Sequence, residues 1–239
     1  MAAIGRPVWL FAVVAAACQI LAPAQTPSAP AARTQARFTV VLDAAHGPDD
    51  PGALLPEDNS APAKEKDVTL ALSVRLRSLL AARGFTVVTT RESDTSLDAQ
   101  HRAETANRAL AQACLLLHAS STGSGIHLFL SALAPAQTGR ILPWSTAQSA
   151  SIERSIALAG VLNASLHHAG MKVTLGRASV SPIDSLNCPA VAIEIAPEPQ
   201  SGARPIGPQD PAYQSRVAEA LAAALLEWRS APPAEFHQP

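Results

Sequence analysis

The sequence predicts a single α/β domain whose mainly parallel, twisted sheet is flanked by helices. Short apolar runs at 38–43, 85–90 and 113–120 alternate with longer segments of helical periodicity. These runs are apolar almost throughout, which is typical of strands covered on both faces. Strands that alternate with helices of this length indicate β-α-β units, which pair their strands in parallel.

The clearest helix is expected to begin at Glu65. Its apolar stripe recurs at spacings of four and three, through Val68, Leu72, Leu76 and Leu79. Gly84 then lies at a position typical of the residue after a helix end. Further helices are expected at 96–113, 151–170 and 213–229, and further strands at 125–133 and 188–197. Asp98 or Ser96 is the expected N-cap of the second helix. The segments 44–64 and 134–148 are expected to be loops, and 172–187 irregular or short-stranded.

The first 24 residues are typical of a secretory signal peptide. Arg6 precedes an apolar run, and Ala22-Pro23-Ala24 offers a cleavage site. We therefore expect an exported protein of the periplasm or cell envelope, with no membrane span in the mature chain. An uncleaved anchor and a lipoprotein modified at Cys18 remain alternatives. We expect a linker at 25–37, the folded domain at 38–230 and a tail at 231–239.

Composition argues against two classes of partner. The formal net charge is −1, which gives a nucleic-acid partner no electrostatic support. Aromatic residues make up 4% of the chain, too few for a stacking platform for bases or sugars. After export, Cys114 and Cys188 would remain. They are either two buried thiols or, if their strands are neighbours, a disulfide.

Four polar residues lie at the ends of predicted elements. His46, His118 and Glu194 each close an apolar run, and Glu65 opens the first helix. In an open α/β sheet the carboxyl ends of parallel strands and the helix N-termini meet at one edge. Two imidazoles and two carboxylates meeting there indicate a zinc hydrolase, with three metal ligands and one acid/base.

Each residue also has a simpler interpretation. A single histidine at a strand end is usually a hydrogen-bonded core or rim residue, and a glutamate at a helix start is favoured by the helix dipole alone. His127 lies within a predicted strand and could face either side, so it is not assigned to the metal. Trp144 is expected to cap the core, with a place at the rim of the site as the alternative.

The flanking sequence resembles the zinc-dependent N-acetylmuramoyl-L-alanine amidases of peptidoglycan, the amidase type 3 family. The resemblance runs in order through VVLDAAHG (40–47), EKDVTLALSVRLRSLLAARGFTVVTTRESD (65–94), LDAQHRAETANRA (97–109), LLHAS (116–120), GIHLFL (125–130) and PAVAIE (189–194). An ordered set of this kind is far more specific than any one of its motifs.

The resemblance implies a cofactor, a substrate and residue roles. His46, Glu65 and His118 fall on the family's zinc ligands, and Glu194 falls on its catalytic glutamate. The implied reaction is hydrolysis of the amide between N-acetylmuramic acid and L-alanine, which releases the stem peptide. Arg91, Asp94, Arg102 and Asn107 fall in the stretch from the second strand into the second helix, where we expect them to fix the turn by charge-assisted hydrogen bonds.

The chain departs from the family pattern around three of these residues. Ala44-Ala45 precedes His46, Ser120 stands two residues after His118, and Ile195 follows Glu194. The departures leave two alternatives: a non-catalytic wall-binding or regulatory protein, and a zinc peptidase that cleaves another amide. The sequence leaves open whether the protein needs a protein activator, and any blocking element is expected within 134–155.

Overall fold

The computed structural model describes residues 1–2, 38–56, 61–137 and 141–230. The predicted signal peptide beyond its first two residues, the linker and the tail lie outside this part of the chain, as does Cys18. No helix of the described residues is both long and apolar enough to cross a membrane.

Six strands form one sheet in the spatial order β4-β1-β5-β8-β6-β7. They are β1 (Thr39–Ala44), β4 (Thr86–Thr89), β5 (Ala113–Ala119), β6 (Ile126–Ser131), β7 (Val173–Ala178) and β8 (Ala190–Ile195). Every neighbouring pair is parallel except β6 and β8, which are antiparallel. The predicted α/β class and its mainly parallel sheet are therefore confirmed.

The described residues also form four α-helices and two short 3₁₀ helices. They are α1 (Glu65–Ala82), α2 (Ala99–Arg108), η1 (Trp144–Ala150), α3 (Ile152–His168), η2 (Ile183–Ser185) and α4 (Pro211–Ser230). The predicted cap of α2 is Asp98, whose side chain accepts a hydrogen bond from the His101 N–H at 2.8 Å. Segment 172–187 forms β7 and η2, in line with the expected short strand.

The expected loop at 44–64 contains a small antiparallel pair, β2 (Leu54–Leu55) and β3 (Ala63–Lys64). Each strand has only two residues, too few for alternation to reveal it in the sequence. Leu55 is fully buried against Val68 of α1 and Ala119 of β5. The pair therefore anchors the loop that carries His46 toward α1.

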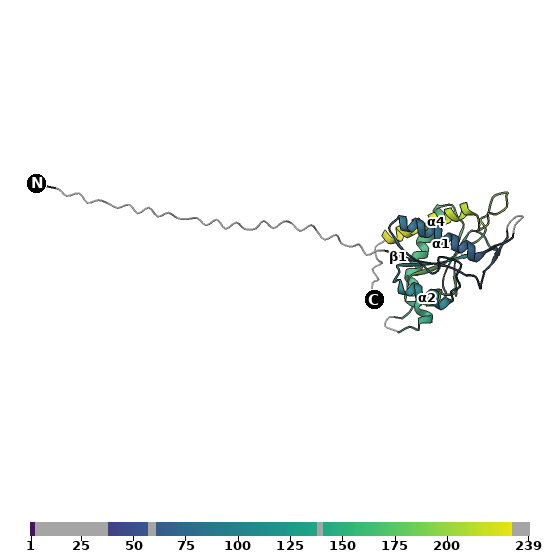
Figure 1. The fold of residues 1–239 in the computed structure, drawn as a ribbon, viewed down its shortest axis with the longest axis horizontal. Helices are drawn as coiled ribbons and strands as arrows, with labels where there is room; N and C mark the ends of the chain where they lie inside the picture. Colours follow the sequence, from purple (N-terminus) through teal and green to yellow (C-terminus); the bar gives the residue numbers. More distant parts are fainter. Residues whose placement is uncertain (3–37, 57–60, 138–140, 231–239) are drawn as a thin grey trace. The chain divides into compact units, whose positions relative to one another are not determined.

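The two faces of the sheet carry different amounts of apolar cover. Val40 and Leu42 of β1 point into a large core with α1, α3 and α4, whereas Val41 points into a smaller cluster with α2 and η2. Figure 1 shows α1 and α4 together on one side of β1, with α2 on the other. We call these the three-helix face and the α2 face.

A disulfide joins Cys114 and Cys188 on the α2 face, with their Cα atoms 6.1 Å apart. Cys114 lies in β5 and Cys188 just precedes β8, and these two strands are neighbours in the sheet. Of the two alternatives for this pair, the structure therefore contains the bridge rather than two thiols.

Candidate metal centre

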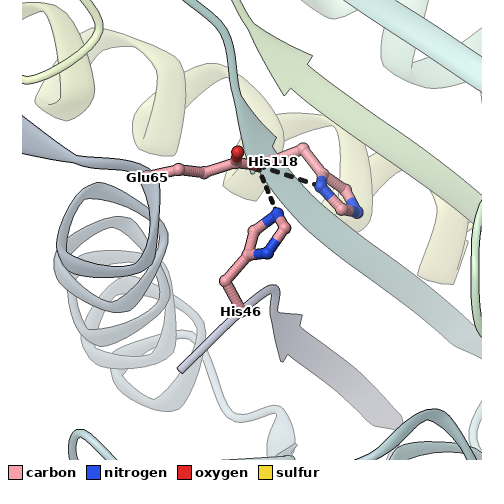
Figure 2. A group of neighbouring side chains, drawn as sticks. All are labelled: His46, Glu65 and His118. Atoms are coloured by element: carbon pink, nitrogen blue, oxygen red, sulfur yellow. Dashed lines mark hydrogen bonds and ion pairs between the residues drawn. The ribbon is translucent and has the colours of Figure 1, made fainter. Parts of the chain in front are cut away.

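Three of the four predicted site residues come together at the carboxyl edge of the sheet. His46 follows β1, His118 is the penultimate residue of the neighbouring strand β5, and Glu65 is the first residue of α1. Figure 2 shows both imidazole rings turned toward the Glu65 carboxylate, which lies between them. We call these three residues the His–Glu–His cluster.

The atoms of this cluster are close enough to share one cation. Glu65 Oε1 lies 3.1 Å from His46 Nε2 and 3.1 Å from His118 Nδ1. One candidate ligand atom from each residue lies within 4.8 Å of the other two. Imidazole nitrogen and carboxylate oxygen are the ligands of catalytic zinc sites, so the residues fit a divalent metal of this kind.

The two ring nitrogens of His118 have different surroundings. Nδ1 faces Glu65 Oε1, which also lies close to His46. Nε2 is buried and has no hydrogen-bond partner among the described residues. Nδ1 is therefore the nitrogen of this ring that can join Glu65 and His46 around one cation.

The cluster keeps Glu65 ionised. Burial alone raises the pKa of Glu65, but hydrogen bonds from His118, His46 and two backbone N–H groups outweigh burial and hold this pKa well below its usual range. The hydrogen bond to Glu65 raises the pKa of His46 against the effect of burial, and Asp50 raises it further. A carboxylate that stays charged in a buried place is a suitable cation ligand.

The backbone at His46 adopts an uncommon conformation that places its ring. His46 has φ +65°, in the left-handed region that favours glycine. Asp50 Oδ2 lies 2.7 Å from His46 Nδ1, and this contact directs the other ring nitrogen toward Glu65. Gly52 is required beside them, because a Cβ there would lie 2.7 Å from both Glu65 Oε2 and His46 Cδ2.

Two buried arginines hold the chain just before and at His46. Arg102 Nη1 donates to Asp43 Oδ1 at 2.7 Å, and its Nη2 donates to the His46 carbonyl at 2.7 Å. Arg91 donates to the carbonyls of Ala44 and Ala45 at 2.8 and 3.0 Å. The hydrogen-bonding role expected for these arginines is thus present, but it reaches across to the β1 end rather than acting only within their own turn.

Glu194 lies in β8, the strand next to β5, and is the register partner of His118. It is not one of the three clustered residues, and its closest polar contact is to a histidine that was not predicted to belong to the site. His127 Nδ1 lies 2.7 Å from Glu194 Oε1. The alternation in GIHLFL predicts that His127 lies in a strand. It does not show which face of the sheet the His127 side chain occupies, so the contact with Glu194 was not predicted.

A cleft of about 540 Å³ reaches the cluster from the α2 face. His46, His118 and Asp50 line it from the sheet edge, and Leu97 to Ala99 line it from the start of α2. Its size is in the range of small-molecule sites. The two histidines of the cluster can therefore be reached from this side, whereas Glu65 and Glu194 are not among the residues that line the cleft.

Any blocking element was expected within 134–155. The described part of this segment contributes no residue to the lining of the cleft. Gln148 of η1 is buried, and its amide donates to the carbonyls of Leu186 and Cys188. The expectation that Trp144 caps the core is wrong, because Trp144 is 62% exposed.

The fold and the cluster define the class of protein: an α/β domain with a His–Glu–His site suited to a divalent metal at the carboxyl edge of its sheet. The chain belongs to the N-acetylmuramoyl-L-alanine amidase family, whose model matches residues 40–227. No significant match to a curated protein was found.

Solved structures of amidases share this fold. The catalytic domain of CwlV from Bacillus (Paenibacillus) polymyxa is 23% identical, with a TM-score of 0.61 over 80% of this chain and 98% of the other. AmiC2 of Nostoc punctiforme is 23% identical, with a TM-score of 0.61 over 81% and 98%. CwlD of Clostridioides difficile, solved in complex with the GerS lipoprotein, is 22% identical, with a TM-score of 0.59 over 81% and 99%.

Proposed function

We propose that this protein is an exported, zinc-dependent amidase that hydrolyses the bond between N-acetylmuramic acid and L-alanine in peptidoglycan and releases the stem peptide. One observation carries the proposal: in a chain of the amidase family, ligand atoms of His46, Glu65 and His118 lie within 4.8 Å of one another. Zinc is the proposed metal because this ligand set is one that catalytic zinc sites use.

In this proposal each polar residue has one task. His46, Glu65 and His118 would hold a zinc ion, which when bound would supply Lewis-acid activation of a water molecule. Glu194 would take a proton from the attacking water and give it to the amine nitrogen of L-alanine as the amide bond breaks. The position of Glu194 beside His118 in the sheet register supports this assignment.

The proposal places the protein in the periplasm or cell envelope. Its N-terminal sequence is typical of a signal peptide, and the Cys114–Cys188 disulfide is a bond that persists in oxidising compartments. A protein activator is part of the proposal, and the CwlD–GerS complex of a structural neighbour is a precedent for a protein partner. Nucleic acid is not among the proposed partners.

A second candidate function is a wall-binding protein without catalysis. The changed residues around His46 and after Glu194 favour it, because they alter the surroundings of the proposed site. Retention of Glu194 together with the three residues of the cluster argues against it, since a protein without catalysis has no need for the cost of these buried and half-buried polar groups.

The test is digestion of purified peptidoglycan by the full protein, with product analysis by mass spectrometry. We expect free stem peptides that begin with L-alanine, lost on chelation and restored by zinc. Glu194→Gln is the matched variant, because it keeps the shape of the side chain and removes its basicity. It is expected to retain zinc and lose turnover.

Each other outcome identifies a different protein. Binding to peptidoglycan without release of peptides, with zinc loaded, would favour the wall-binding candidate. Cleavage at another amide would make the protein a zinc peptidase. Wild-type turnover in Glu194→Gln would remove Glu194 from the mechanism and leave the zinc site in place.

A further inference from the structure

His127 and Glu194 face each other directly across the antiparallel pair β6–β8. Their side chains are 18% and 30% exposed, and His127 Nδ1 lies 2.7 Å from Glu194 Oε1. With His118 on the other side of Glu194, the three residues form one row across three neighbouring strands. The row connects the His–Glu–His cluster to His127 through the proposed acid/base.

The His127 ring is confined on two sides. Gly123 has φ +80°, and a Cβ at that position would lie 2.5 Å from His127 Cε1. Phe129, two residues along the same strand, makes an edge-to-face contact with ring centroids 6.2 Å apart and planes at 74°. A ring held in this way presents Nδ1 to Glu194 in one orientation.

The chemistry of the pair sets the direction of the hydrogen bond. An ionised carboxylate can only accept, so the proton is on Nδ1 of His127, and this N–H donates a hydrogen bond to Glu194 Oε1. Glu194 Oε2 has no hydrogen-bond partner among the described residues. One carboxylate oxygen is therefore engaged and the other is available.

We infer that His127 is a positioning residue for Glu194: it fixes the carboxylate through Oε1 and leaves Oε2 as the oxygen that accepts the proton of the attacking water. The inference rests on the proposed function and deepens it. In the reaction the carbonyl carbon gains a bond to the water oxygen and loses its bond to nitrogen. The proton moves from water to Oε2 and then to the amine, while His127 keeps its own proton throughout.

The test compares two variants at this position. His127→Leu removes the donor, and we expect kcat to fall about 10- to 100-fold with KM and zinc content unchanged, as expected when a residue that orients a reacting group is lost. His127→Asn places an amide N–H close to the position of Nδ1, and we expect it to recover most of the lost kcat.

Thr174→Ala is the matched control. Thr174 lies in β7 on the other side of His127 in the same row, and no hydrogen bond joins it to Glu194. We expect wild-type kcat from it. Equal losses in His127→Leu and His127→Asn would overturn the inference, because the ring would then act by its shape. Loss of zinc in His127→Leu would also overturn it.

A second measurement needs no turnover. NMR of protein labelled with ¹⁵N-histidine reports which ring nitrogen of His127 carries the proton, and His127→Asn assigns the signal. A protonated Nδ1 supports the inference, and an unprotonated Nδ1 overturns it. If the wild-type protein releases no stem peptide, the proposed function fails. If the wild type is active and His127→Leu matches it, the inference alone fails.

Discussion

The three-helix face and the α2 face of the sheet are stabilised by different kinds of contact. On the three-helix face, α1, α3 and α4 pack a continuous apolar core against alternate residues of the strands. The α2 face has a smaller apolar cluster, a disulfide, two buried arginines and the cleft that reaches the His–Glu–His cluster. We infer that apolar burial stabilises the domain mainly on the three-helix face. On the α2 face the disulfide and the charged hydrogen bonds take this role, which leaves room there for the cleft.

Glu65→Gln gives the largest expected effect, which is the loss of zinc binding and of activity. Glu65 belongs to α1 but reaches the edge of the α2 face, where it contacts both histidines. A neutral amide is a poor zinc ligand, so we expect zinc affinity to fall by about 100-fold or more and peptide release to reach background. Isothermal titration with zinc and the digestion assay check this.

The same variant should also cost some stability. The backbone N–H groups of Ala53 and Ala119 donate to different carboxylate oxygens of Glu65, Oε2 at 2.9 Å and Oε1 at 3.1 Å, and a glutamine side chain has only one oxygen that can accept. One of the two hydrogen bonds is therefore lost, and we expect the metal-free free energy of unfolding to fall by about 1–3 kcal/mol. A larger loss would show that the cluster is a main source of stability, against the comparison of the two faces.

The Cys114–Cys188 disulfide is expected to stabilise the α2 face. It closes a loop between residues separated by 74 positions, and the chain-entropy model gives such a crosslink about 4 kcal/mol. We expect the double variant Cys114→Ala/Cys188→Ala to lose about this amount in denaturant unfolding, and reduced wild type to behave alike. A change below about 1 kcal/mol would mean that this face is stabilised by its packing after all.

Much of the fold could be predicted because short stretches of the sequence are enough to indicate each helix and strand. The apolar runs and the helical stripe beginning at Glu65 give the elements, and the ends of those elements give His46, His118 and Glu194. The contact between His127 and Glu194 could not be predicted, because it depends on the register of β6 against β8. The left-handed backbone at His46 could not be predicted either, since it is held by arginines from distant segments.

Leu72→Ala tests the three-helix face from within the same helix as Glu65. Leu72 is fully buried in the large core. Removing its side chain is expected to cost about 3 kcal/mol through lost burial and a cavity. Zinc affinity and activity per folded molecule should match the wild type, as measured by titration and digestion well below the unfolding temperature. A drop in zinc affinity would show that the two faces are mechanically coupled.

The smallest expected effect is a shift in the pH dependence of zinc binding, and it tests whether charge on the α2 face is tuned for the metal. Without metal, the hydrogen bond to Glu65 raises the pKa of His46 above its usual 6.5, and Asp50 raises it further. A raised pKa stabilises the folded metal-free protein fully below pH 6.5, and this contribution is lost as pH rises through the folded pKa of His46.

Zinc requires the neutral imidazole, so its apparent affinity should rise with pH through that same range. Asp50→Asn removes one of the contributions that raise the pKa, so the midpoint of the affinity profile should move to lower pH. Titration with zinc between pH 5.5 and 8, about two and a half units around an ordinary histidine pKa, checks both statements. A profile that is unchanged in Asp50→Asn would show that the carboxylate orients the ring without tuning its charge.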